Sequence, residues 1–142
     1  TLLKEQGYAF TDYHAYEQHT RCVILRHDID HSLPQALRLA ELEAEEGVHS
    51  TWFVLLTSDF YNPASASSLS ALRRIRELGH ELGLHFDEAA YPAGAPEETV
   101  GHILHEREIL SSIFHAPTLQ GDLRGGSENF RYGQLLRADL FP

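Results

Sequence analysis

The sequence predicts an α/β fold with parallel strands, either an open sheet or part of a (β/α) barrel, in a single domain over residues 1–142. Short apolar runs alternate three times with segments in which apolar residues recur at helical spacing. Strands that alternate with helices join through right-handed crossovers into a parallel sheet. The length of 142 residues suits one domain and no more.

The first strand and the first helix are expected between residues 21 and 47. Residues 22–25 form a continuous apolar run, which is typical of a strand covered on both faces. Ser32 and Gln35 have the spacing of a capping box, with a proline in the first helical turn. The apolar side of this helix and the glycine that ends it are Leu33, Ala36, Leu37, Ala40, Ala44 and Gly47.

Two further strand–helix pairs follow along the chain. A strand is expected over 49–57 (HSTWFVLLT), which is rich in β-branched and aromatic residues, and a shorter one over 81–87 (ELGLHFD). The helix between them has one apolar face and ends at Gly79, and Pro96 opens the last helix. The apolar positions of these two helices are Leu69, Leu72, Ile75 and Leu78, then Val100, Ile103, Leu104, Leu110 and Ile113.

The composition excludes several classes of protein. Eleven Lys and Arg residues against twenty-one Asp and Glu give a formal net charge of -10, so we expect no nucleic-acid partner and no anionic membrane surface. No apolar run approaches the roughly 18 residues of a membrane span and no signal-peptide pattern opens the chain, which predicts a cytoplasmic protein. The single cysteine, Cys22, excludes an internal disulfide. Because the chain starts at Thr1 and contains no methionine, we interpret it as a fragment with structure missing at its ends.

Acidic and histidine side chains gather where two of the expected strands end. Asp28 and Asp30 are two residues apart, so on an extended strand they share one face, and His85 and Asp87 stand in the same relation. If these strand ends are neighbours, the crowded groups favour a cation among them. Zinc accepts mixed histidine and carboxylate ligands, and one carboxylate can stay off the metal as a general base.

Three other residues near this edge have open interpretations. Tyr61 and Asn62 follow the second strand, where they could contact a substrate or could serve only to order the loop. Arg26 precedes the site and is a candidate to balance the carboxylates or to orient Asp28.

Three segments of the chain resemble landmarks of a known superfamily. RHDID, GVHSTWFVL and GHELGLHFD look like successive motifs of the polysaccharide deacetylase (NodB-homology, carbohydrate esterase family 4-like) superfamily. The matched region runs from about residue 21 to residue 87. The first motif, written HDxD rather than FDD, is most similar to a little-characterised bacterial branch that is partly associated with surface-polysaccharide gene clusters.

The resemblance implies a fold, a reaction and a set of site residues. The fold would be a distorted (β/α) barrel of the deacetylase type, truncated here because the chain is short for a full barrel and would end before its C-terminal part. Asp28 would be the catalytic base, while Asp30 and His85 would bind the metal, most often zinc, with nickel, cobalt or manganese as alternatives. The reaction would remove an N-acyl or O-acyl group from a carbohydrate, such as an N-acetylated sugar or a surface-polysaccharide precursor, by means of a metal-activated water.

One position departs from the family pattern. The family places a second metal histidine four residues after the first, and this chain has Ala89 there. Asp87 is our candidate substitute because it shares a face with His85, and His27 and His31 are weaker candidates.

Two other functions stay open. A catalytically degenerate domain of the same fold, binding glycan or a protein partner, is favoured by the missing histidine and the short chain. A phosphohydrolase of the haloacid-dehalogenase type is a poorer alternative, because it needs a lysine after its D-x-D motif and the only lysine here is Lys4.

Overall fold

A three-stranded parallel sheet forms the centre of the protein. The computed structural model describes residues 2–114. Strands β3 (Arg26–Ile29), β4 (Thr51–Leu55) and β5 (Glu81–His85) lie in the order β3-β4-β5, and both neighbouring pairs are parallel. All three carboxyl ends therefore lie at the same edge of the sheet, as the alternation of strands and helices predicts.

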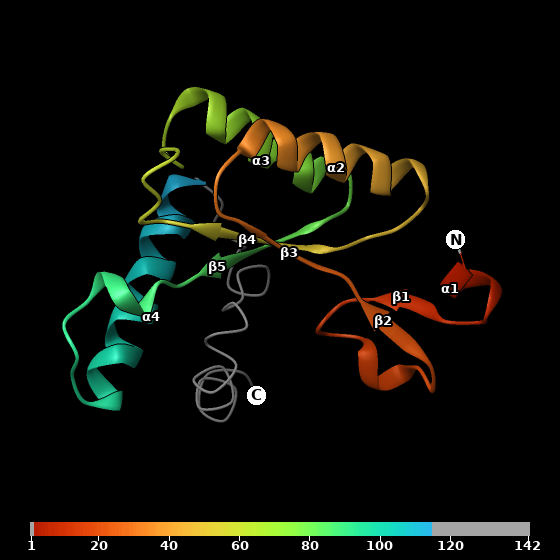
Figure 1. The fold of residues 1–142 in the computed structure, drawn as a ribbon, viewed down its shortest axis with the longest axis horizontal. Coiled ribbons are helices and arrows are strands. Elements are labelled where there is room, and N and C mark those ends of the chain that lie inside the picture. Colours follow the sequence, from red (N-terminus) through yellow and green to blue (C-terminus); the bar gives the residue numbers. More distant parts are fainter. Residues whose placement is uncertain (1, 115–142) are drawn as a thin grey trace.

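A helix follows each of these strands, which confirms the predicted order. Helix α2 (Leu33–Glu45) begins at Ser32, whose Oγ accepts a hydrogen bond from the Gln35 N–H at 3.4 Å. Helix α3 (Ala66–Glu77) begins earlier than its apolar positions predict, because the Ser65 side chain caps it from within the serine-rich loop. Helix α4 (Pro96–Ile113) starts at the predicted proline. In Figure 1, α2 and α3 lie side by side over one face of the sheet.

The N-terminal part differs from the prediction of a single buried strand built on the apolar run 22–25. Strand β1 (Ala9–Thr11), which the sequence did not predict, pairs in parallel with β2 (Cys22–Ile24) in a separate two-stranded sheet. The chain then changes partner at Leu25 and continues as β3 beside β4. The apolar run at the start of the predicted strand is consequently only partly buried.

Short elements complete the described chain. They are helix α1 (Leu2–Glu5) and the 3₁₀ turns η1 (Tyr16–Gln18) and η2 (Glu88–Ala90). Within residues 2–114 the strands form one two-stranded and one three-stranded sheet, and neither closes into a barrel. Among these described residues, none of the helices has both the length and the apolar character needed to cross a bilayer.

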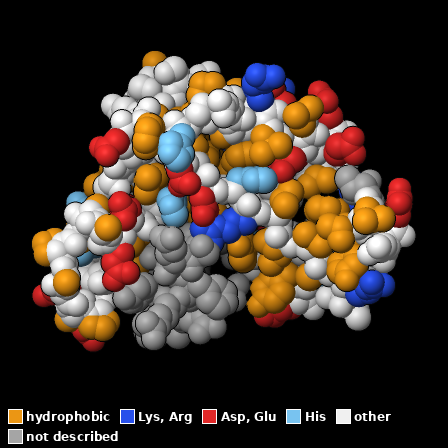
Figure 2. Space-filling model, viewed as in Figure 1, with side chains coloured by type: hydrophobic (Ala, Val, Ile, Leu, Met, Phe, Trp, Pro, Cys, Tyr) orange, Lys and Arg blue, Asp and Glu red, His pale blue; other side chains and the backbone are white. Residues whose placement is uncertain are grey.

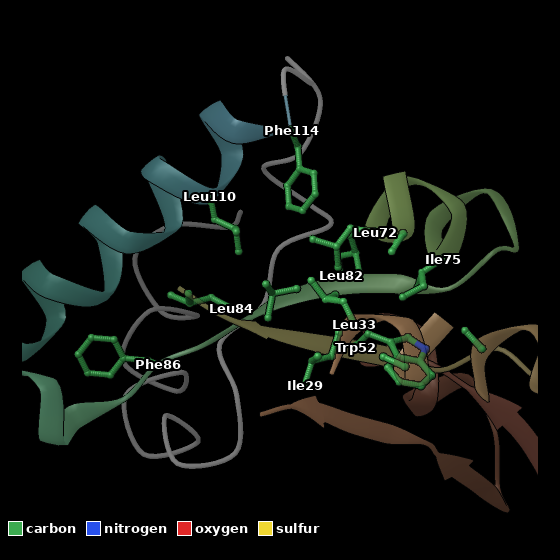
Figure 3. Packing of buried hydrophobic residues seen from close by; sticks show 14 of the residues in the cluster. Ile29, Leu33, Trp52, Leu72, Ile75, Leu82, Leu84, Phe86, Leu110 and Phe114 are labelled. Carbon is green, nitrogen blue, oxygen red and sulfur yellow. The ribbon is translucent and has the colours of Figure 1, made fainter. Parts of the chain in front are cut away.

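The two faces of the three-stranded sheet have different surroundings. Alternate side chains point to opposite faces, so Ile29, Val54 and Leu84 share the face that the helices cover. These residues belong to one hydrophobic core with side chains of α2, α3 and α4, including Leu33, Leu72 and Leu110 (Figure 3). The other face includes Arg26, Asp28, Phe53 and His85.

Candidate active site

Asp30 and His85 meet at the carboxyl edge of the sheet. Asp30 directly follows β3 and His85 is the last residue of β5, with β4 between the two strands. Even so, the Asp30 Oδ1 and the His85 Nε2 are 3.5 Å apart. The Asp30 side chain is half exposed, whereas that of His85 is largely buried. The proximity of Asp30 and His85, on which the site predicted from the sequence depends, is therefore present in the structure.

The two ring nitrogens of His85 have different surroundings. Its Nε2 faces Asp30, while its buried Nδ1 has no hydrogen-bond partner among the residues that the structure describes. Buried polar atoms are normally paired, so an unpaired ring nitrogen is unusual. A histidine that binds a metal through one ring nitrogen normally donates a hydrogen bond from the other, and among the described residues His85 lacks that second contact.

Asp28 is held by a neighbouring arginine on the same strand. Arg26 donates from Nε to the Asp28 Oδ1 at 2.9 Å, and from Nη2 to Oδ1 at 2.6 Å and Oδ2 at 2.8 Å. The guanidinium also lies over the Phe53 ring, 4.5 Å from its centroid. Fork-like pairing of this kind fixes the plane of a carboxylate as well as balancing its charge. The candidate role of Arg26 as an orienting residue is thus compatible with its position.

Polar and apolar side chains gather over this edge of the molecule. In Figure 2, acidic side chains in red lie between histidines in pale blue, with a basic side chain and hydrophobic ones beside them.

Asp87 is not brought into a ligand set with Asp30 and His85. Its Oδ1 accepts a hydrogen bond from the Ala89 N–H at 2.9 Å and caps the turn η2. Among the residues that the structure describes, no group of three or more His, Cys, Asp or Glu side chains is arranged to hold a metal ion. Strand β5 ends at His85, so the alternation used to place Asp87 on the same face does not extend to it.

Tyr61 and Asn62 both take part in ordering the loop after β4. The Tyr61 hydroxyl donates to the Ile29 carbonyl at 2.7 Å and accepts from the Leu55 N–H at 3.0 Å, which ties β3 to β4 at their carboxyl ends. Burial raises the pKa of Tyr61 to about 12. The Asn62 Oδ1 accepts from the Ala64 N–H at 2.9 Å. These contacts favour the loop role over a substrate contact for both residues.

We expect Tyr61→Phe to lower the free energy of unfolding by about 1–2 kcal/mol, because it leaves two backbone groups without their partner. Urea unfolding followed by circular dichroism measures this effect. Tyr8→Phe is the matched control, since the ring of Tyr8 packs on Arg21 and no described hydrogen bond involves its hydroxyl. If both substitutions had the same small effect, the Tyr61 hydroxyl would not tie the two strands together.

Sequence reasoning did not identify Ser58 as part of this edge. The Ser58 Oγ donates to the Asp30 carbonyl at 3.2 Å and accepts from the Phe60 N–H at 3.1 Å. The loop after β4 is therefore fastened to the loop after β3 right beside Asp30. The only sequence signal was a small polar residue just past a predicted strand, a pattern too common to single it out.

One comparison with known proteins indicates the type of fold. The structure is similar to that of a CE4 esterase from Streptococcus mutans, with a TM-score of 0.51 and 20% sequence identity, covering 87% of this chain and 51% of that one. The likeness shows the fold. It confirms the expected deacetylase-like α/β architecture, while the chain spans about half the length of that esterase.

A second solved structure is also similar to this chain over part of its length. It is the chitin deacetylase from the fungal pathogen Colletotrichum lindemuthianum, with a TM-score of 0.49 and 20% identity, covering 63% of this chain and 39% of that one. No protein-family profile and no curated protein matches this sequence.

Proposed function

We propose that the protein is a metal-dependent hydrolase that removes an N-acyl or O-acyl group from a carbohydrate. The observation that carries the proposal is the approach of Asp30 to His85, at 3.5 Å, on the edge of the sheet where Asp28 also lies. In parallel α/β folds this edge is where ligands bind. The similarity in fold to a CE4 esterase supports the same class of reaction.

The donor atoms of Asp30 and His85 suit a divalent metal ion. One carboxylate oxygen and one imidazole nitrogen are donors that zinc accepts, and nickel, cobalt and manganese accept them too. The Oδ1 of Asp30 and the Nε2 of His85, 3.5 Å apart, would hold such an ion. Such an ion, when bound, supplies Lewis-acid chemistry that lowers the pKa of water and polarises an acyl carbonyl.

Asp28 is the residue that we assign as general base. It would accept the proton of the attacking water, and the Arg26 fork would hold its carboxylate in one orientation as it does so. Arg26 donates twice to Oδ1 but once to Oδ2, so Oδ2 keeps a lone pair available to the proton.

The proposed function is tested by acetate release. Purified protein dialysed against zinc is incubated with tetra-N-acetylchitotetraose, for an amide substrate, and with acetylated xylan, for an ester substrate. We expect acetate from at least one of them, and its loss when a chelator removes the metal. Absence of acetate from both substrates with zinc, nickel, cobalt and manganese in turn would contradict the proposal.

A glycan-binding domain without catalysis is the second candidate. Ala89 stands where a second metal histidine is expected, and residues 2–114 contain no group of three or more metal-ligating side chains. Catalytic zinc sites commonly have three protein ligands, so two would hold the ion more weakly. Binding of the same oligosaccharide without acetate release, under any of the four metals, would favour this candidate.

A further inference from the structure

Phe60 presents an aromatic ring to solvent beside the candidate site. It lies in the loop after β4 and its exposed fraction is 66%, the second highest among the large hydrophobic residues of the described chain. Exposure alone does not mark a site, because single apolar side chains are common on protein surfaces. Phe60 differs from these because its position is fixed next to Asp30.

Two independent contacts fix Phe60. Its backbone N–H donates to the Ser58 Oγ, which in turn donates to the carbonyl of Asp30. Its ring lies against the imidazole of His31, with 4.4 Å between the ring centroids and 48° between the planes. Tyr61, the next residue, is tied to both β3 and β4 by its hydroxyl. These contacts fix the loop backbone at Phe60, and the His31 contact restricts its ring, which reduces the entropy cost of binding.

The chemistry of this surface suits a sugar ring. The face of an aromatic ring carries partial negative charge and attracts the C–H groups on the apolar side of a pyranose. Hydroxyl groups at the rim of the same sugar need hydrogen-bond partners, and the half-exposed carboxylate of Asp30 and the exposed imidazole of His31 offer them. This surface therefore offers an aromatic ring face for the C–H groups of a sugar and polar side chains for its hydroxyl groups.

We propose that Phe60 and His31 form a platform on which one pyranose ring of the substrate packs, directly beside the Asp30–His85 pair. This platform would select carbohydrate esters and amides over small acyl compounds. The inference rests on the proposed function, which identifies the ligand as a carbohydrate. The experiment below distinguishes a failure of the platform from a failure of the proposed reaction.

The test compares Phe60→Ala with Phe60→Tyr, which keeps the ring. We expect Phe60→Ala to raise KM for tetra-N-acetylchitotetraose about tenfold with little change in kcat. The rate with 4-nitrophenyl acetate, which has no sugar, should stay at the wild-type value for both variants. Thermal melting controls for stability, and little change is expected because the side chain is exposed.

Binding of the oligosaccharide, measured by NMR titration, keeps this test independent of hydrolysis. If wild type binds the sugar and Phe60→Ala binds it about tenfold more weakly, the platform is supported. This holds even when no acetate is released, because that result contradicts only the proposed reaction. Equal binding and equal KM for wild type and Phe60→Ala would overturn the platform while leaving the hydrolase proposal intact. No sugar binding by wild type would overturn the platform as well.

Discussion

Asp28→Asn is expected to lower the rate of acetate release by about 10²–10⁴-fold, the range lost when a general base is removed. Asparagine has nearly the same shape as aspartate but cannot accept the proton at neutral pH. The hydrogen bonds from Arg26 are weakened in this variant, but the amide oxygen of asparagine still accepts one, so we expect the fold to be retained. Steady-state kinetics with the substrate on which wild type is active measures the effect.

Asp87→Asn is the matched control for this prediction. It makes the same chemical change at another aspartate that the sequence placed near the site, and asparagine can still cap the turn η2. Because Asp87 is not grouped with Asp30 and His85, we expect Asp87→Asn to release acetate at a rate within about threefold of wild type. A rate for Asp28→Asn above about a tenth of wild type would rule out Asp28 as the base.

Leu72→Ala should lower the free energy of unfolding by about 3 kcal/mol, a large share of the 5–15 kcal/mol that stabilises a typical domain. Leu72 lies on α3, is 0% exposed and belongs to the core that packs the helices on the sheet (Figure 3). Its truncation removes apolar contacts and leaves a cavity that the surrounding packed side chains fill only in part. Urea or thermal unfolding followed by circular dichroism gives the change.

Leu42→Ala makes the same substitution at an exposed position of a helix. Leu42 lies on α2 and is 59% exposed, so little burial is lost and alanine favours the helix slightly. We expect a change within about 0.5 kcal/mol. Similar losses at both leucines would mean that the face of α3 assigned to the core does not pack there.

The helices and strands were largely predictable because their signals are local. The Ser32 cap and the Pro96 start come from a few adjacent residues, and the structure begins α2 and α4 where these residues indicate. The parallel order of β3, β4 and β5 follows from the alternation of elements. The same alternation predicted that Asp30 and His85 lie close together, because the carboxyl ends of parallel strands lie at one edge of the sheet.

The choice of strand partners was not predictable in the same way. The run 22–25 has the composition of a core strand, yet the chain leaves β1 for β4 at Leu25, and only long-range pairing decides this. The position of Asp87 was not predictable for a related reason. An i, i+2 relation places two side chains on one face only within a strand, and β5 ends at His85, so Asp87 caps the turn η2 instead. Phe60 carries no sequence signal, because exposed aromatic residues are recognised only from their surroundings.

Zinc binding by wild type, Asp30→Ala and His85→Ala tests most directly whether these two residues share a metal ion. Equilibrium dialysis followed by elemental analysis reports the bound zinc per chain, and His105→Ala, which removes an exposed histidine of α4, controls for weak binding by other histidines. We expect about one zinc equivalent for wild type and for His105→Ala, and a fall in affinity of at least about 100-fold for the other two variants. Equal zinc binding by all four proteins would contradict the proposed metal site.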